Sequence, residues 1–166
     1  FMYSANEAAE ALASNTLGHD EFIKAMNDKA KAIGLEDTNF TNPTGLEGDG
    51  KQFTTTYDLL VITKYALQSP LFKKVTGTFV HHIPYSEDHK ELYLQNETNL
   101  LSSYPGVFGG KDGYTPEAGL CLVTYLNYKG HKIIGIILGS DNRRQEMKDL
   151  LDYSLKLQGI TPPPHS

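Results

Sequence analysis

The segment from Gly109 to Gly119 holds the side chains with the clearest chemical meaning in this chain. It reads GGKDGYTPEAG, with Lys111 standing among glycines just ahead of two strongly apolar stretches. Glycine allows a ligand to approach the main chain without meeting a Cβ atom. A single cation beside such backbone suits an anionic substrate that lies along a strand. The pattern is also typical of a Gly-rich turn that enters a hairpin, with a solvated lysine at the strand end.

Three other sets of polar residues invite a chemical interpretation. From the residues alone, Ser4 is best explained as the N-cap of an alanine-rich helix. His81 and His82 are neighbours on an expected strand, so their side chains point to opposite faces and do not form a metal site. Glu47 and Asp49 could bind calcium, but the ligand spacing of a calcium loop is missing. We therefore predict no metal and no cofactor.

Composition limits the classes of protein that this chain can belong to. Its 166 residues suit one domain, and the 39% of hydrophobic residues are enough for a core. The net charge is −5 and no basic stripe exists, which argues against nucleic-acid binding. Cys121 is the only cysteine, so no internal disulfide can form. No apolar run reaches the roughly 18 residues of a membrane span. A helical pattern that begins at Phe1 suggests a truncated or processed chain.

Hydrophobic periodicity and turn residues predict a mixed α and β domain. The residue types that carry these predictions are helix formers with capping residues, alternating or continuous apolar runs, and Gly, Pro and Asn between them. The expected helices are 2–15, 20–33, 55–68 and 142–157, with a short helical turn from Ser69-Pro70, a long loop over 36–53, short strands at 79–84 and 92–95, a helical turn within 96–103, and a hairpin of strands 120–128 and 131–138 around Lys129-Gly130.

The second strand of this hairpin needs cover on both of its faces. It is apolar at nearly every position from Ile133 to Leu138, unlike a strand with one face in water. The final helix can cover one face of the sheet. The side chains expected to do so are Met147, Leu150, Leu151 and Leu155.

Five segments together resemble one known family. In order along the chain they are Ser4-Ala5-Asn6, 40–46, 54–59, 96–101 and 109–119. Their types and separations are similar to those of the D-alanyl-D-alanine carboxypeptidases, the low-molecular-mass penicillin-binding proteins, from Phe1 to about Gln158. The resemblance implies an α+β fold of the β-lactamase and transpeptidase type, an antiparallel sheet flanked by helices. It also makes residues 1–158 a partial catalytic domain and 159–166 a Pro-rich exit linker.

The resemblance also implies a role for individual residues. Ser4 would relay a proton to the leaving amine, which suits a hydroxyl because it can donate and accept at once. Lys111 would attract the terminal carboxylate of the substrate. The Tyr114 N–H would supply half of an oxyanion hole. The expected catalytic residues are thus Ser4 and Lys111, and the expected substrate-binding residues are Asn6, Asp112, Gly113, Tyr114 and Thr115.

The chain departs from the family pattern in two ways. The family's nucleophile lies in a Ser-x-x-Lys pair upstream of the Ser-x-Asn segment, and the chain has no such pair. The segment Ser69-Pro70-Leu71-Phe72 ends in phenylalanine rather than lysine. Asp112 stands where the family usually has Thr or Ser. An ionised aspartate cannot donate a hydrogen bond to a substrate carboxylate, and it could pair with Lys111 or point to the other face of the strand.

These observations predict a fragment of a serine D-alanyl-D-alanine carboxypeptidase that is inactive alone. The implied partners are peptidoglycan stem peptides ending in D-Ala-D-Ala and, for the whole protein, β-lactams. The implied location is extracytoplasmic, in the bacterial cell envelope. Only about three of the fold's five strands are visible, so the uncovered sheet could bind another chain or a second copy. The alternatives are a non-catalytic envelope module that binds peptidoglycan or a protein, and a β-lactamase relative.

Overall fold

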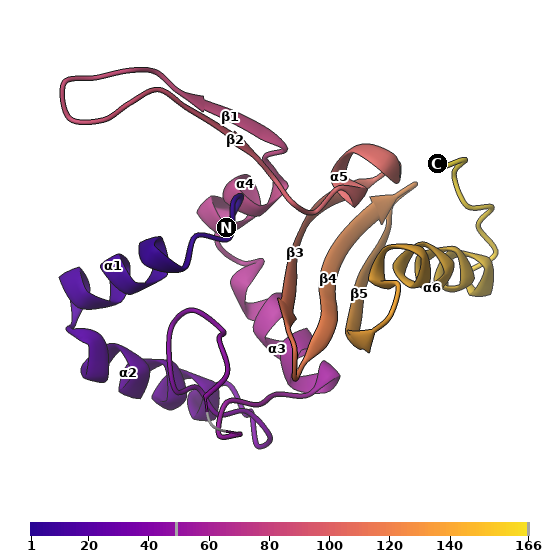
Figure 1. Cartoon of the computed structure of the whole chain (residues 1–166). Helices are drawn as coiled ribbons and strands as arrows, with labels where there is room; N and C mark the ends of the chain where they lie inside the picture. The colour runs from indigo at the N-terminus through magenta and orange to yellow at the C-terminus, as the bar shows by residue number, and fades with distance from the viewer. Residues whose placement is uncertain (49, 166) are drawn as a thin grey trace.

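A computed structural model describes residues 1–48 and 50–165 of the chain, so that Asp49, one of the two residues considered for calcium, lies outside it. The described residues form six helices and five strands (Figure 1). In chain order they are α1 (Asn6–Thr16), α2 (His19–Ala32), α3 (Thr56–Ala66), α4 (Pro70–Gly77), β1 (Val80–Ile83), β2 (Leu92–Gln95), α5 (Leu100–Ser103), β3 (Val107–Thr115), β4 (Gly119–Tyr128), β5 (His131–Ser140) and α6 (Arg143–Leu157).

The central element is an antiparallel sheet with the strand order β3-β4-β5. The predicted hairpin is confirmed: β4 and β5 pair up to Tyr128 opposite His131. The two turn residues, Lys129 and Gly130, both have positive φ, 51° and 84°. Such a turn matches the right-handed twist of the two strands, and glycine adopts it without strain. In the described part of the chain β3 and β5 are the edge strands of this sheet.

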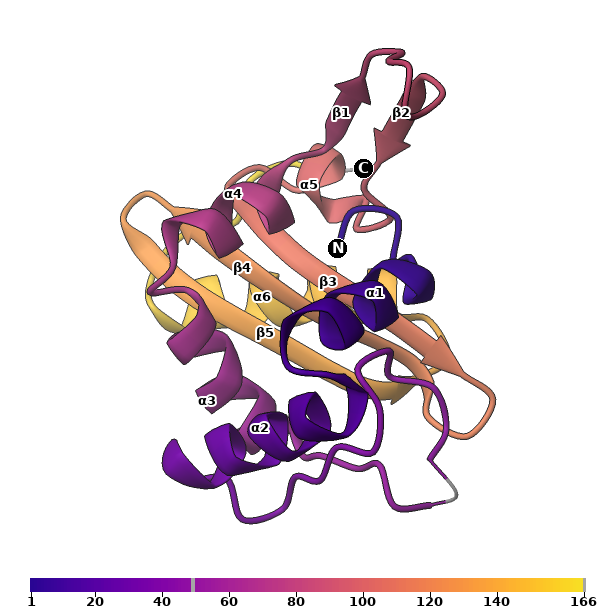
Figure 2. The ribbon, with the colours of Figure 1, turned by 90° about the vertical axis from the view of Figure 1, so that its left-hand side faces the viewer.

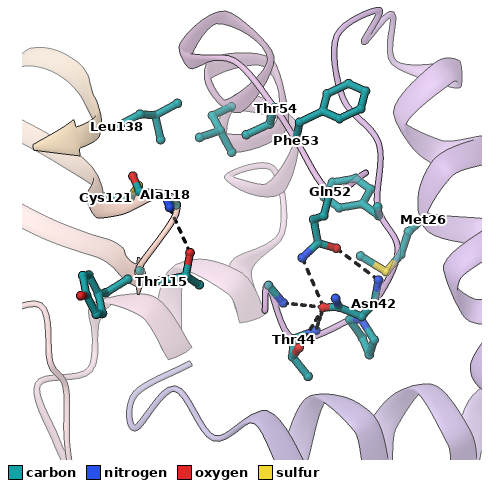
Figure 3. A pocket seen from close by; sticks show the side chains of 16 residues that line it. Met26, Asn42, Thr44, Gln52, Phe53, Thr54, Thr115, Ala118, Cys121 and Leu138 are labelled. Atoms are coloured by element: carbon teal, nitrogen blue, oxygen red, sulfur yellow. Dashed lines mark hydrogen bonds between the residues drawn. The ribbon is translucent and has the colours of Figure 1, made fainter. Parts of the chain in front are cut away.

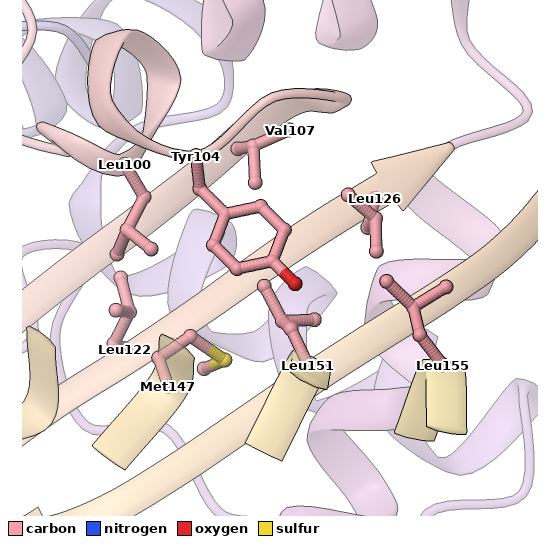
Figure 4. Packing of buried hydrophobic residues seen from close by; sticks show 8 residues of the cluster. All are labelled: Leu100, Tyr104, Val107, Leu122, Leu126, Met147, Leu151 and Leu155. Carbon is pink, nitrogen blue, oxygen red and sulfur yellow. The ribbon is translucent and has the colours of Figure 1, made fainter. Parts of the chain in front are cut away.

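Helix α6 covers one face of the sheet, and the hydrophobic core lies between them (Figure 4). Leu151 is fully buried, as predicted, whereas Leu150 keeps 36% of its surface exposed. The prediction that Leu150 faces the sheet is therefore wrong, because neighbouring helical residues lie about 100° apart around the axis. The buried cluster consists of Leu100, Tyr104, Val107, Leu122, Leu126, Met147, Leu151 and Leu155.

The opposite face of the sheet is covered by the earlier helices (Figure 2). Helix α3 packs against β5 and α4 packs against β3. The apolar strand β5 therefore has cover on both faces, as its sequence predicts. In Figure 2, α1 and α2 also lie in front of the sheet, on the side away from α6.

Local signals explain how the helices on this face begin. The Thr55 side chain accepts a hydrogen bond from the Asp58 N–H, which caps α3 as predicted. Ser69 caps α4 in the same way, and Pro70 occupies its first turn. The segment from Ser69 is thus a full helix rather than the predicted single turn. Helix α1 begins at Asn6 and not at residue 2.

Strands β1 and β2 form a separate two-stranded hairpin that projects from the body (Figures 1 and 2). Both predicted strands are confirmed. The His82 ring stacks on Tyr93 with their centroids 4.4 Å apart, and its Nε2 lies 2.7 Å from the Glu91 carboxylate. Within residues 1–48 and 50–165 no three His, Cys, Asp or Glu side chains gather in a way that could hold a metal ion.

The carboxy-terminal residues fold back onto the body of the molecule. Ile160 packs against the core cluster and Pro163 is buried. His165 stacks on Tyr104 and lies 3.0 Å from the Asp152 carboxylate, which also accepts a hydrogen bond from the Tyr104 hydroxyl at 2.7 Å. Burial and this carboxylate raise the pKa of Tyr104 well above its ordinary value. None of the helices in the described residues combines the length and the apolar character that crossing a membrane requires.

The neighbouring leucines of α6 test the position of the core. We expect Leu151→Ala to lower the free energy of unfolding by about 3 kcal/mol, because it removes fully buried methyl groups and leaves a cavity. Leu150→Ala makes the same chemical change at a partly exposed position, and should cost less than about 1 kcal/mol. Urea unfolding followed by circular dichroism measures both. Equal losses would contradict the packing of α6.

Candidate functional site

Strand β3 carries the residues for which the sequence predicts substrate binding. It pairs with β4 from Val107 to Thr115, with a register irregularity between Val107 and Gly109. Because β3 is an edge strand, every second N–H and C=O of its backbone points away from β4. This free edge is where an extended ligand could lie.

Two glycines of β3 are required by the protein itself. A Cβ atom on Gly109 would lie 2.7 Å from the Tyr125 ring. One on Gly110 would lie 2.6 Å from the Val123 carbonyl oxygen and 2.9 Å from the Thr98 side chain. The prediction that these glycines make room for a ligand is therefore wrong. Burial of Tyr125 in this packing raises the pKa of its hydroxyl to about 12.

The third glycine of the motif is different. A Cβ atom on Gly113 would meet no atom within 4 Å, so the space beside this residue is open. Gly113, Tyr114 and Thr115 belong to the part of β3 that lines a pocket. Only this end of the motif is accessible in the way that the sequence analysis expects of all its glycines.

Lys111 and Asp112 form an ion pair on β3. The Lys111 ammonium donates to the Asp112 backbone carbonyl and lies 3.1 Å from its Oδ1. The other carboxylate oxygen, Oδ2, accepts a hydrogen bond from Arg143 Nη2 at 2.8 Å. Of the alternatives considered from the sequence, the local pair with Lys111 is therefore present. Arg143 was missed because it lies on α6, and nothing in the sequence around it indicates contact with β3.

Arg143 also fixes the direction of the β3 backbone. Its Nη1 contacts the carbonyl oxygens of Gly113 at 2.6 Å and Cys121 at 3.3 Å. These two residues are partners across β3 and β4. One nitrogen can reach both oxygens only if the carbonyls point toward the facing strand. The N–H of the next residue, Tyr114, then points to the free edge, as an oxyanion-hole donor would require.

An edge-on and a tilted contact between aromatic rings connect the amino terminus with the sheet. The Phe1 ring lies 5.5 Å from Phe72 of α4, and the Phe72 ring lies 6.1 Å from Tyr125 of β4, measured between centroids. Met2 is buried, and its carbonyl accepts a hydrogen bond from the Glu97 N–H at 3.2 Å. Since Tyr125 packs on Gly109, these contacts hold the first residues of the chain on the same face as α4.

Ser4 follows this anchor in an unusual backbone conformation. Its φ is 50°, in the left-handed region that residues with a Cβ atom seldom adopt. It is exposed, and the N-cap of α1 is Ala5, so Ser4 is not the helix cap that the residues alone suggest. Strained residues of this kind often lie at functional sites. Asn6, half-buried, is the first residue of the helix.

A pocket of about 570 Å³ separates the end of β3 from the loop between α2 and α3 (Figure 3). The loop is held in shape by Asn42 Oδ1, which accepts hydrogen bonds from Thr44 and Gly45, and by Gln52, which bonds to Asn42 and to the Leu46 carbonyl. Side chains of both walls face this space in Figure 3. The lining residues are Met26, Phe40, Asn42, Pro43, Thr44, Gly45, Gln52, Phe53, Thr54, Leu59, Gly113, Tyr114, Thr115, Ala118, Cys121 and Leu138.

The pocket unites some of the expected site residues and not others. Gly113, Tyr114 and Thr115 line it, whereas Ser4 and Lys111 are not among the residues of its wall. The opposite wall, formed by the 40–54 loop, was not expected as part of a site. However, the segments 40–46 and 54–59, which contribute residues to the pocket wall, were two of the five that carried the family resemblance.

Comparisons with known proteins identify the family and the fold. A family model described as D-alanyl-D-alanine carboxypeptidase matches residues 1–142. D-alanyl-D-alanine carboxypeptidase DacF of Bacillus subtilis is 36% identical over 155 residues, which cover 91% of this chain and 39% of that protein. The crystal structure of a Mycobacterium tuberculosis D-alanyl-D-alanine carboxypeptidase superimposes with a TM-score of 0.84 at 29% identity, covering 99% of this chain and 64% of the other.

A further solved structure connects the fold with antibiotic binding in another protein. Penicillin-binding protein D2 of Listeria monocytogenes, in its cefotaxime-bound form, matches with a TM-score of 0.76 and 32% identity, covering 90% of this chain and 60% of that one. The fold is therefore that of the penicillin-binding and transpeptidase class, α+β as predicted. The chain belongs to the D-alanyl-D-alanine carboxypeptidase family. It spans about two fifths of the length of the Bacillus subtilis relative, 39%.

The glycines of β3 allow a test that separates folding from ligand access. Gly110→Ala should lower the free energy of unfolding by about 2 kcal/mol, because its Cβ would collide with the Val123 carbonyl. Gly113→Ala should change it by less than about 1 kcal/mol, because the space beside it is open. Denaturant unfolding of both variants is the measurement. A larger loss at Gly113 than at Gly110 would refute this description of the strand.

Proposed function

We propose that this chain is the carboxy-terminal part of the catalytic domain of a serine D-alanyl-D-alanine carboxypeptidase, with residues 1–158 as the domain portion. The whole protein removes the terminal D-alanine from peptidoglycan stem peptides through an acyl-enzyme. The observation that carries the proposal is the arrangement of the amino terminus. The contacts of the Phe1 ring with Phe72 and of Phe72 with Tyr125, which pairs with Gly109 of β3, support a position of the Ser4 segment close to the strand that carries Lys111.

The proposed chemistry divides between this chain and residues that precede it in the whole protein. A serine in a Ser-x-x-Lys pair attacks the peptide carbonyl, and its lysine acts as the base. Ser4 relays a proton to the leaving amine, and Asn6 holds the substrate amide. Lys111 attracts the terminal carboxylate. Because an ion pair gains strength when it is removed from water, this contact stabilises the complex more than a surface pair would.

The backbone of β3 completes the proposed site. The N–H of Tyr114 and the N–H of the nucleophilic serine form the oxyanion hole. One such donor lowers the barrier by roughly 3 kcal/mol. Gly113 leaves space for the substrate beside the strand, and Thr115 lines the pocket. Without the nucleophile, this chain alone gives no turnover.

The partners and location follow from this chemistry. The substrate is a stem peptide ending in D-Ala-D-Ala, and β-lactams acylate the same serine in the whole protein. Two solved structures of one relative, the cefotaxime- and ampicillin-bound forms of the Listeria protein, support β-lactam binding by the whole protein. A protein that acts on peptidoglycan works in the cell envelope, outside the cytoplasm.

A second candidate function is a non-catalytic envelope module that binds peptidoglycan or a protein partner. The ion pair of Asp112 with Lys111 favours it, because the lysine is then less available to a substrate carboxylate. The gene sequence upstream of Phe1 discriminates between the two. A Ser-x-x-Lys pair several tens of residues before Ser4 supports the enzyme, and its absence supports the binding module.

Fluorescent penicillin labelling of the full-length protein tests the proposed enzyme. We expect Lys111→Gln to lower the second-order rate of labelling by at least about tenfold, because the antibiotic's carboxylate loses its cation. Lys156→Gln removes an exposed lysine from α6 and should leave the rate unchanged. Equal rates in the wild-type protein and Lys111→Gln would rule out the proposed role of Lys111.

Self-association of the isolated chain is a separate prediction. The free edges of β3 and β5 and exposed apolar side chains, among them Leu12, Leu17 and Phe53, leave surface that a partner could cover. We expect static light scattering of the 166-residue chain to give at least the mass of a dimer at micromolar concentration. A monomer that persists across the concentration range would show that this surface does not bind a second copy.

A further inference from the structure

The carboxylate of Asp112 lies between two cations. Its Oδ1 is 3.1 Å from Lys111 Nζ, and its Oδ2 is 2.8 Å from Arg143 Nη2. The Asp112 side chain is 11% exposed, against 29% for Lys111 and 23% for Arg143. All three charges are therefore partly removed from water. Ion pairs at this depth are screened less by salt than pairs on the surface.

We propose that Asp112 is an internal counter-ion that occupies the anion position beside Lys111, and that Arg143 is the positioning residue that limits its hold on the lysine. This inference rests on the proposed function, because it takes Lys111 as the cation for the ligand carboxylate. A ligand must then compete with Asp112 for the ammonium group. The three side chains together carry a net charge of +1, so the site still attracts an anion.

The surroundings of Arg143 explain why it can hold Asp112 in place. It is the first residue of α6, and two further hydrogen bonds fix its guanidinium to the Gly113 and Cys121 carbonyl oxygens. A cation at a helix amino terminus is disfavoured by the helix dipole. The Asp112 carboxylate offsets this cost because it brings a negative charge to the same end of the helix. The pair thus joins α6 to β3 at the level of the site.

Removing either charge should have opposite effects on a ligand carboxylate. Without the Asp112 charge, Lys111 loses its internal partner and its ammonium is available to the ligand. Without the Arg143 charge, Asp112 has only Lys111 to pair with, and its like charge opposes the ligand. The effect of Arg143 acts through Asp112. It should therefore disappear when Asp112 is already neutral, which is the signature of a coupled pair.

The test compares acylation of the full-length protein by benzylpenicillin and by its methyl ester, which lacks the carboxylate. The ratio of the two second-order rates reports carboxylate recognition and is insensitive to general damage to the site. We expect Asp112→Asn to raise the ratio by about tenfold and Arg143→Gln to lower it by about as much. In the double variant, Arg143→Gln should change the ratio by less than about twofold. The control variants, Asp141→Asn and Arg144→Gln, alter exposed charges close by and should leave the ratio unchanged.

Two results would overturn the inference: a ratio that Asp112→Asn does not raise, or an Arg143→Gln effect that persists undiminished in the double variant. Failure of the proposed function is a different outcome, in which the wild-type protein and all variants resist both compounds. The inference is then decided without a ligand by NMR of the Lys111 ammonium protons. They should exchange with water more slowly in the wild-type protein than in Asp112→Asn. Equal exchange in the two proteins would refute the internal ion pair.

Discussion

The close packing of Tyr125 and Thr98 against β3 is the contact on which the rest of the site depends. These side chains fill the positions that Cβ atoms would occupy on Gly109 and Gly110. Because Gly109 and Gly110 are neighbours on the strand, these contacts lie on opposite faces of β3. In the described part of the chain the outer edge of β3 stays unpaired. Tyr125 also supports Phe72, and through it the aromatic contact of the amino terminus. The buried Tyr125 ring is thus in contact with β3, the strand that carries Lys111, and through Phe72 it is linked to Phe1, three residues before Ser4.

The second constraint is the pairing of the charged side chains of Lys111 and Asp112 on β3 with Arg143 on α6. Lys111, Asp112 and Arg143 lie in partly buried positions where an unpaired charge would be costly. Each has an ionic partner, and Arg143 satisfies two backbone carbonyls as well. An aspartate in this position is therefore compatible with a stable fold. Asp112 instead affects ligand binding, because the Lys111 ammonium that would pair with a ligand carboxylate is already paired with the Asp112 carboxylate.

Local structure could be predicted from sequence where a single residue determines it. Ser69 ahead of a proline marks the start of a helix, and Gly130 supplies the positive φ of a hairpin turn. Predictions failed where the deciding contact is distant in sequence. Leu150 looks like a core residue by type, but the orientation of α6 leaves it partly exposed. The sequence suggests that Gly110 makes room for a ligand, but the Thr98 side chain occupies that space. Arg143 reaches β3 only because α6 folds back across the sheet. Periodicity contains no information about such contacts.

The proposed site requires that Ser4 and Lys111 face a common ligand although they are far apart in sequence. A crystal structure of the full-length protein with a covalently bound penicillin tests it most directly. We expect the Ser4 hydroxyl and the Lys111 ammonium to lie within hydrogen-bonding distance, about 3 Å, of the adduct or of one water that contacts it. We also expect the Tyr114 N–H to point at the acyl oxygen. An adduct that lies away from β3, with Ser4 on another face of the molecule, would contradict it.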